Sequence, residues 1–206
     1  MLIGITGGSG SGKSTVSKYL LTKLGNAKRI TVDNIMEKNL VILYGKDIMK
    51  EFNQKEYNPI ELFESIEAVN KWMKICGENI YYEIEELIEK YSSKYENIIV
   101  DFCFLPMLDT WDECDMTINV KADTDIRYDR LKQRLINTCY AYEWINEISL
   151  SNRLKATSLD EYGYKSQYTV YNNGSYEELT KQVDEVLRKR TIKKLVIWLI
   201  FFILKL

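Results

Sequence analysis

A glycine-rich segment near the start of the chain restricts the fold more than any other feature of the sequence. Residues 7–15 read GGSGSGKST and fit the phosphate-binding pattern of Gly, four residues, and then Gly-Lys-Ser/Thr. The apolar run 2–6 before it predicts a buried strand, and residues 14–24 after it carry apolar side chains at helical spacing. A strand, a glycine loop and a helix in this order bring backbone N–H groups together around a polyphosphate. We therefore expect the chain to bind a nucleoside triphosphate.

Length and composition place the chain among single-domain cytosolic enzymes. It has 206 residues, of which 46% are hydrophobic and 28% charged, and its formal net charge is -2. That charge argues against broad nucleic-acid binding, which needs a basic face. The four cysteines fit no zinc spacing, and without histidine the chain has neither a histidine ligand nor a histidine base. Reduced cysteines, and a first strand that no signal peptide precedes, predict a cytoplasmic protein.

Five short apolar segments predict the strands of one sheet. They lie at 2–6, 28–32, 97–101, 116–120 and 167–171. Helices are expected between and after them, at 14–24, 34–43, 58–95, 124–135, 143–157 and 176–190. This alternation implies an α/β fold in which helices cover both faces of a five-stranded, mostly parallel sheet, with a helical insertion and a lid. Ligands of such sheets bind beyond the carboxyl ends of the strands.

The same patterns divide the chain into a core, a lid, a helical subdomain and a tail. Residues 1–57 and 96–190 form the predicted nucleotide-binding core, with the lid at about 136–160. The helical segment 58–95 is expected to bind the substrate, and Gly77 is a point where it can break. Residues 191–206 form a hydrophobic C-terminal tail.

Three features of the sequence are expected at the edge where ligands bind: the glycine loop, Asp33 and Asp101. Lys13 of the loop can reach the β- and γ-phosphates, and the hydroxyl of Ser14 can ligate magnesium. Asp33 follows the second strand, so its carboxylate can accept a proton from a substrate hydroxyl; the alternative is a helix N-cap. Asp101 ends an apolar strand, where a carboxylate can act on magnesium through water. Ser14 and Asp101 are therefore the predicted metal residues.

Three arginines share one face of the helix 124–135. Arg127, Arg130 and Arg134 lie three and four residues apart. Because guanidinium groups stabilise charge on a transferred phosphoryl group, we assign that role to Arg130 and Arg134. Arg127 is expected on a solvated face, paired with nearby aspartates. Arg153 belongs to the segment that is expected to fold over the nucleotide as a lid.

Residues 195–204 read LVIWLIFFIL and are the most unusual part of the sequence. They follow a basic stretch that runs from Arg188 to Lys194. A membrane-spanning helix needs about 20 apolar residues, so this run is short for that role. Three alternatives stay open: packing on this domain or on another subunit, lying in a membrane surface beside the lysines, and a short tail anchor.

Four stretches of the chain resemble the dephospho-CoA kinase family. They are ITGGSGSGKSTV at 5–16, VDNIMEKNL at 32–40, RLKQR at 130–134 and YNNGSYEEL at 171–179. The first is specific by itself, and the others support it by their order and spacing. The resemblance implies a P-loop kinase that transfers the γ-phosphoryl group of ATP to the ribose 3′-hydroxyl of dephospho-CoA.

The same resemblance implies roles for individual residues. Asp33 would handle the 3′-hydroxyl, Arg130 and Arg134 would steady the phosphates, and the helices at 58–95 would bind the substrate. The residues implied for ATP and magnesium are Gly10, Ser11, Gly12, Lys13, Ser14 and Thr15.

The sequence also departs from that family, in ways that bear on the acceptor. The family usually carries a His-Pro pair in its substrate-domain helices, whereas the matching neighbourhood here is about Gly77-Glu78. The strand near 98–105 reads VDFCFLP where the family usually has Pro-Leu-Leu, and the tail is foreign to it. A nucleoside or nucleoside monophosphate kinase, similar to uridine kinase in its opening residues, is therefore the alternative. A nucleotide-binding regulator with a membrane-associated tail is the second alternative.

Overall fold

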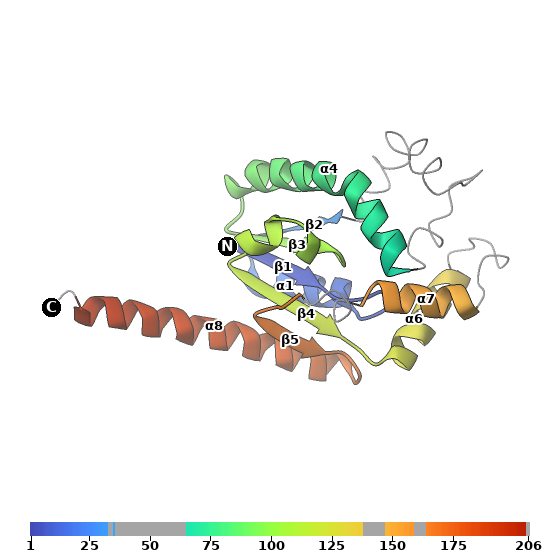
Figure 1. Cartoon of the computed structure of the whole chain (residues 1–206). Helices are drawn as coiled ribbons and strands as arrows, with labels where there is room; N and C mark the ends of the chain where they lie inside the picture. Colours follow the sequence, from blue (N-terminus) through green and yellow to red (C-terminus); the bar gives the residue numbers. More distant parts are fainter. Residues whose placement is uncertain (33–34, 36–64, 138–146, 159–163, 205–206) are drawn as a thin grey trace.

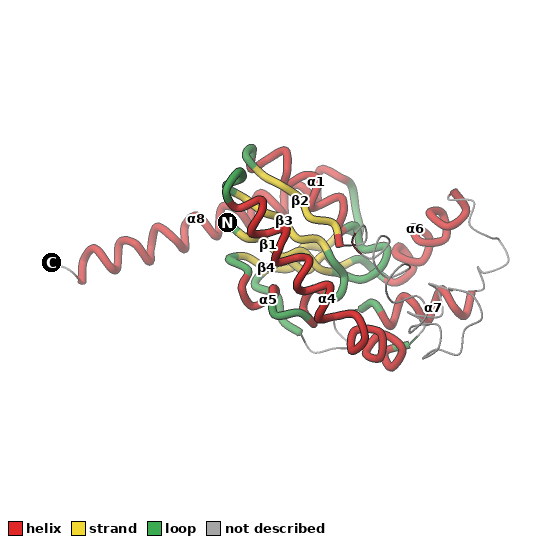
Figure 2. Tube along the Cα trace, turned by 90° about the horizontal axis from the view of Figure 1, so that it is seen from above, coloured by secondary structure: helices red, strands yellow, loops and turns green. Residues whose placement is uncertain are grey.

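The computed structural model describes residues 1–32, 35, 65–137, 147–158 and 164–204. Within them, one five-stranded sheet lies between two layers of helices (Figures 1 and 2). The strands are β1 (Leu2–Thr6), β2 (Ala27–Thr31), β3 (Asn97–Asp101), β4 (Met116–Lys121) and β5 (Tyr168–Tyr171). Their order is β2-β3-β1-β4-β5, and every pair is parallel. The predicted α/β fold is confirmed.

The alternation of side chains along each strand divides the core into two layers. In β3, Ile98 and Val100 belong to one hydrophobic cluster, while Ile99 between them belongs to the other. Successive side chains of a strand point to opposite faces, so a sheet covered on both sides needs apolar residues at every position. The near-continuous apolar runs of the strands follow from this burial.

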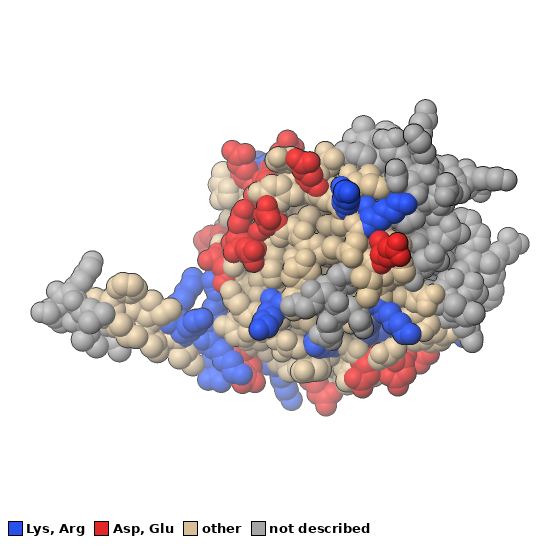
Figure 3. Space-filling view, in the orientation of Figure 1, with Lys and Arg blue, Asp and Glu red and all other residues tan. Residues whose placement is uncertain are grey.

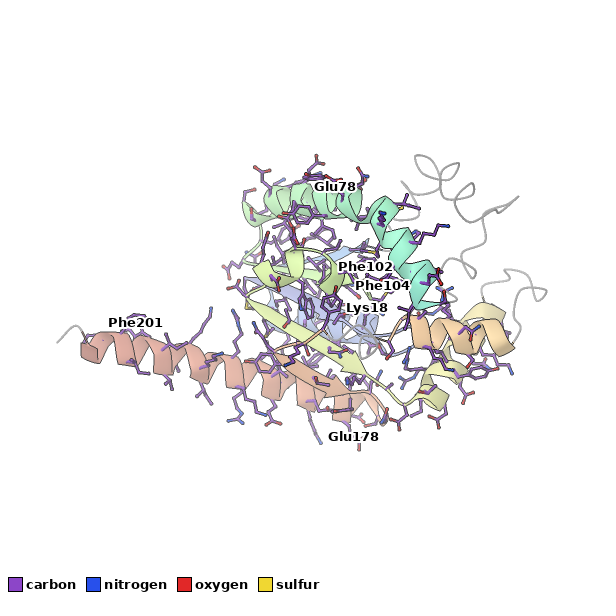
Figure 4. The ribbon with its side chains drawn as sticks, in the orientation of Figure 1. Lys18, Glu78, Phe102, Phe104, Glu178 and Phe201 are labelled. Carbon is purple, nitrogen blue, oxygen red and sulfur yellow. The ribbon has the colours of Figure 1, made fainter. Side chains whose placement is uncertain are left out.

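One face of the sheet is covered by α1 (Lys13–Leu24) and by the first half of α8 (Tyr176–Leu204). The other is covered by α4 (Ile66–Ser92), the short helix η3 (Leu105–Met107) and α5 (Thr110–Glu113). Phe102 and Phe104 lie between α4 and the sheet and are almost completely buried (Figure 4). Beyond the carboxyl ends of the strands, α6 (Thr124–Asn137) packs against α7 (Glu147–Ala156) (Figure 1).

One possible helix break does not occur, and one predicted helix end is wrong. α4 continues through Gly77, and Figure 1 shows a bend partway along it and no break. Glycine costs a helix only about 1 kcal/mol relative to alanine, and Gly77 is buried with Met73 and Leu108 beside it. The last helix does not end near residue 190 but continues to Leu204, because lysine and arginine are good helix formers. Of the predicted helix at 34–43, only residue 35 is among the described residues.

The side chains of residues 195–198 and 200–202, the described ones of the apolar run, do not pack on their own domain. Within it, Leu195, Trp198 and Phe201 are 60%, 63% and 64% exposed, and α8 leaves the body of the protein before reaching them (Figure 1). The predicted alternative of packing on this domain is therefore wrong. Among the described residues, no helix is both long and apolar enough to cross a membrane.

Candidate functional site

The loop between β1 and α1 is shaped to receive an anion. Gly10 and Gly12 have φ angles of 78° and 98°, which side-chain-bearing residues rarely adopt. α1 begins directly after Gly12, no side chain in the described residues caps it, and its first turn contains no acidic residue. Its first N–H groups and the positive end of its dipole therefore remain for a negatively charged ligand.

Lys13 and Ser14 place polar groups beside these N–H groups. The Nζ atom of Lys13 lies 3.4 Å from the backbone oxygen of Gly8, so its side chain is folded back over the loop. Ser14 is exposed in the first turn of α1. The hydroxyl of Ser11 is buried and has no hydrogen-bond partner among the described residues. Buried hydroxyls normally have partners, so this group favours a polar ligand in the loop.

A pocket of about 310 Å³ adjoins the loop. Gly8 and Ser11 form its side toward the loop, and Arg127 also lines it. Its other walls come from the ends of β4 and β5, from the start of α6 and from the residue that follows α7 and Thr157: Asn119, Val120, Lys121, Ala122, Asp123, Thr124, Tyr171 and Ser158. The pocket lies at the carboxyl edge of a parallel sheet, the edge at which we expected ligands to bind.

Arg127 is buried and holds the loop in place, so its predicted position on a solvated face is wrong. Its Nε donates to the backbone oxygen of Ser9 at 2.9 Å, and its Nη2 donates to the backbone oxygen of Leu154 at 2.7 Å. The hydroxyl of Thr157 accepts from Arg127 and from the N–H of Ser9. One guanidinium group thus connects the phosphate loop with the end of α7. Helical spacing showed which arginines share a face but not what packs against that face.

Asn172 is a second residue whose role the sequence did not reveal. Its Nδ2 donates to the backbone oxygen of Ser11 at 2.8 Å, and the residue is buried directly after β5. The contact is so close that a Cβ atom on Gly12 would lie 2.1 Å from Asn172 Nδ2. The Asn-Asn-Gly turn was the available signal, since it follows a strand that ends at the ligand edge.

Asp101 is buried in a polar cluster behind α1. Its Oδ2 accepts from Arg29 Nη2 at 2.6 Å and from the Ser17 hydroxyl at 2.8 Å. The same hydroxyl lies 3.2 Å from the backbone oxygen of Ser14. Asp101 is therefore linked through one side chain to the first turn of α1, which carries the predicted magnesium ligand Ser14.

The remaining predicted residues differ in how close they come to the loop. Arg130 Nη1 lies 3.4 Å from the backbone oxygen of Gly10. Arg134 lies one turn further along α6 and is exposed, and Arg153 is half-buried in α7. Asp33 lies outside the described residues.

We expect alanine at Gly10 to disrupt the loop more than alanine at Gly25. Both glycines have positive φ, so either substitution stores backbone strain of about 1–3 kcal/mol. At Gly10 the new Cβ would also lie 2.5 Å from the backbone oxygen of Arg127, whereas at Gly25 nothing lies within 4 Å. Calorimetric titration with ATP should detect binding to the Gly25→Ala variant and little or none to Gly10→Ala. Equal ATP affinity in both variants would contradict the described loop geometry.

Comparison with known proteins gives one family model and several whole-length relatives. The model of the AAA domain family matches residues 3–139. A dephospho-CoA kinase of Fusobacterium nucleatum is 29% identical over 196 residues, which cover 89% of this chain and 95% of that protein. A dephospho-CoA kinase of Aquifex aeolicus is 27% identical, over 92% of this chain and 97% of its own. These relatives confirm the resemblance that the sequence motifs indicated.

A solved structure agrees with the fold. The dephospho-CoA kinase of Campylobacter jejuni superimposes with a TM-score of 0.55 at 18% identity, covering 91% of this chain and 96% of its own. At that identity the likeness concerns the fold alone.

Proposed function

Because this chain belongs to the AAA domain family and carries a glycine loop before an uncapped helix, we propose that it is an ATP-dependent kinase of dephospho-CoA. It transfers the γ-phosphoryl group to the ribose 3′-hydroxyl and gives coenzyme A. The glycine loop supports the part of this proposal that concerns ATP binding. The likeness to curated dephospho-CoA kinases over almost the whole chain supports the choice of acceptor and is the observation that carries it.

The proposed reaction forms one bond and breaks one. The acceptor oxygen attacks the γ-phosphorus, the bond from that phosphorus to the bridging oxygen of ADP breaks, and the hydroxyl proton leaves to a base. Negative charge spreads over the equatorial oxygens of the transferred group. Lys13 and Arg130, which both lie against the loop, are the cations that stabilise this charge. Arg134 and Arg153 complete the set when the lid at about 136–160 covers the nucleotide.

The pocket beside the loop takes the nucleoside part of ATP. It is continuous with the loop through Gly8 and Ser11, and backbone and side-chain polar groups of β4 and β5 line it. The segment 58–95 supplies the acceptor site, and its described part, α4, is anchored to the sheet by buried residues such as Trp72 and Ile80. A rigid wall of this kind can position a substrate against the transferred phosphate.

Asp33 is the proposed base for the 3′-hydroxyl, on the strength of its position in the sequence after β2. Replacing it with asparagine keeps the side-chain volume and removes the proton acceptor. We expect Asp33→Asn to lower kcat by roughly 10²–10⁴-fold while the dissociation constant of ATP stays unchanged. Single-turnover kinetics and calorimetry measure the two quantities. Wild-type kcat in this variant would remove Asp33 from the mechanism.

Magnesium fits the polar groups near the loop. Ser14 offers an exposed hydroxyl in the first turn of α1, and Asp101 lies behind it through Ser17. In proteins, magnesium usually keeps several water ligands and takes only one or two protein ligands besides phosphate oxygens. Ser14 and Asp101 are therefore enough protein groups for such a site. Ser14 would hold the ion through its hydroxyl, and Asp101 would act on it through water. Bound there, the ion would supply positive charge that neutralises the phosphate oxygens.

The role of Asp101 can be tested by its magnesium dependence. We expect Asp101→Asn to raise the magnesium concentration that gives half-maximal rate by about tenfold, because outer partners of a metal contribute that much to affinity. Asp112→Asn, an exposed substitution in α5, should leave this concentration unchanged. The stability of both variants is followed by thermal unfolding, since Asp101 also pairs with Arg29. An unchanged magnesium dependence would make Asp101 a structural residue only.

The acceptor is tested by offering substrates in parallel. Purified protein with ATP and magnesium is given dephospho-CoA, uridine, cytidine or nucleoside monophosphates, and ADP release is followed. The highest kcat/KM is expected for dephospho-CoA. Transfer to a nucleoside alone would favour the alternative kinase, and tight ATP binding without transfer to any acceptor would favour a nucleotide-binding regulator.

We also propose that the enzyme works in the cytoplasm. Cys76 and Cys114 are buried thiols outside any disulfide, and burial raises the pKa of each to about 12. Such thiols stay protonated at neutral pH and react slowly. Reduced, unreactive cysteines are the usual state in a reducing compartment.

A further inference from the structure

The end of α8 carries an exposed apolar surface that takes no part in the proposed phosphoryl transfer. We define the apolar tail as residues 195–204, all of them hydrophobic. It continues α8 beyond the body of the protein, and the side chain of Phe201 lies far from the sheet (Figures 1 and 4). Trp198 and Phe202 stack on each other with ring centroids 5.4 Å apart and are both exposed. Exposed apolar patches of this kind mark interaction sites.

The distribution of these side chains indicates what covers them. Leu195, Val196, Ile197 and Trp198 are consecutive and all exposed, as are Ile200, Phe201 and Phe202. Successive helix residues differ by about 100° in direction, so such runs cover the whole circumference. A partner helix would bury one stripe and leave the rest in water. Lipid acyl chains can surround the tail on every side.

A group of basic side chains lies where the tail begins. We call Arg188, Lys189, Lys193 and Lys194 the basic collar; all four are exposed. Figure 3 shows blue side chains gathered at the point where α8 leaves the body. The whole chain carries a formal net charge of -2, so this positive charge is local. A positive collar next to an apolar helix end complements anionic lipid headgroups above hydrocarbon.

The length of the tail limits how deeply it can enter a lipid bilayer. Ten helical residues extend about 15 Å, which is half of the roughly 30 Å hydrocarbon core of a bilayer. In the sequence, lysines bound the run at both ends, Lys194 before it and Lys205 after it. A lysine at the bilayer centre is costly, so both ends favour positions near the headgroups. These limits agree with a tail confined to one leaflet.

The tail and the phosphate loop lie on opposite sides of the protein. The guanidinium group of Arg190 contacts the sulfur of Met1, just before β1, and also pairs with Asp115 at 3.5 Å, just before β4. α8 therefore leaves past the amino ends of the strands, whereas the loop lies at their carboxyl ends (Figure 1). A membrane that binds the tail would therefore not cover the nucleotide site.

We propose that the apolar tail inserts into one leaflet of an anionic membrane, with the basic collar among the headgroups. The catalytic domain is then held at the membrane surface with its active site facing the solution. This inference does not depend on the identity of the phosphoryl acceptor.

The test uses the full chain and two kinds of vesicle. Co-sedimentation compares phosphatidylcholine vesicles with vesicles that contain roughly 30% phosphatidylglycerol, at low and high salt. Strong binding is expected for the anionic vesicles, with weaker binding at high salt. Trp198→Ser combined with Phe201→Ser, and separately Lys193→Glu combined with Lys194→Glu, should each weaken binding by roughly tenfold or more.

Matched measurements separate the possible outcomes. Tyr82→Ser removes another exposed aromatic side chain, on α4, and should bind vesicles like the wild type. Turnover with soluble substrates should be equal in all variants. Absence of vesicle binding together with tail-dependent oligomers in sedimentation velocity would overturn the proposal in favour of a second copy of the chain. Equal binding to neutral and anionic vesicles would overturn the role of the collar.

Discussion

Replacing Lys13 with alanine should lower kcat by about 10³-fold, the scale on which cations that contact a transferred phosphoryl group contribute. The Lys13 side chain already lies over the loop, with Nζ close to the backbone oxygen of Gly8. In the transition state its charge offsets the negative charge that spreads over the γ-phosphoryl oxygens. Removing it leaves the N–H groups of the loop to bind ATP without this cation. Turnover is measured under saturating ATP and acceptor.

Lys18 supplies the matched control for this variant. It lies on the same helix, α1, is exposed, and carries the same charge (Figure 4). Lys18→Ala changes the net charge as much as Lys13→Ala does but leaves the loop intact. Its kcat should stay within about threefold of the wild type, because exposed charges contribute little. A similar loss in both variants would mean that overall charge, rather than the position of Lys13, supports turnover.

Replacing Arg127 with alanine should destabilise the protein by about 4 kcal/mol. Two backbone oxygens, of Ser9 and Leu154, would each lose a hydrogen bond to a charged donor, and such bonds contribute about 1.5–3 kcal/mol each. For a chain of this size the midpoint of thermal unfolding should fall by about 10 °C. Because the same bonds fix the phosphate loop, KM for ATP should rise as well.

Two further variants make the Arg127 prediction specific. Arg127→Lys keeps the charge but lacks the planar fork that reaches two carbonyl groups, so its stability should lie between those of the wild type and Arg127→Ala. Arg188→Ala removes an arginine whose side chain is 65% exposed, and its stability should change by less than about 0.5 kcal/mol. If Arg127→Ala unfolds at the wild-type temperature, the described link between the loop and α7 is wrong.

The strands could be predicted from sequence almost to the residue. The run 97–101 was expected and β3 is Asn97–Asp101, while 116–120 was expected and β4 is Met116–Lys121. Strands buried on both faces are continuous apolar runs between polar residues, so their limits are visible in the sequence. The glycine loop was predictable for a related reason, since its residue types and its position between strand and helix are all constrained.

Features that depend on tertiary packing could not be predicted. The sequence places Arg127 on a face of α6 but cannot show that Ser9 and Leu154 approach that face. η3 and α5 contain three and four residues and are too short to show a helical period. The last helix was expected to end at 190, within the basic stretch, although lysine and arginine are good helix formers and α8 continues to Leu204.

Identification of the phosphorylated product tests the central claim most directly. The protein is incubated with magnesium, dephospho-CoA and ATP that carries an isotopic label in its γ-phosphoryl group, and the products are analysed by mass spectrometry and phosphorus NMR. The account predicts coenzyme A with the label in a new ribose 3′-phosphate monoester, formed in a one-to-one ratio with ADP. Labelled inorganic phosphate as the sole labelled product, with dephospho-CoA unchanged, would contradict it.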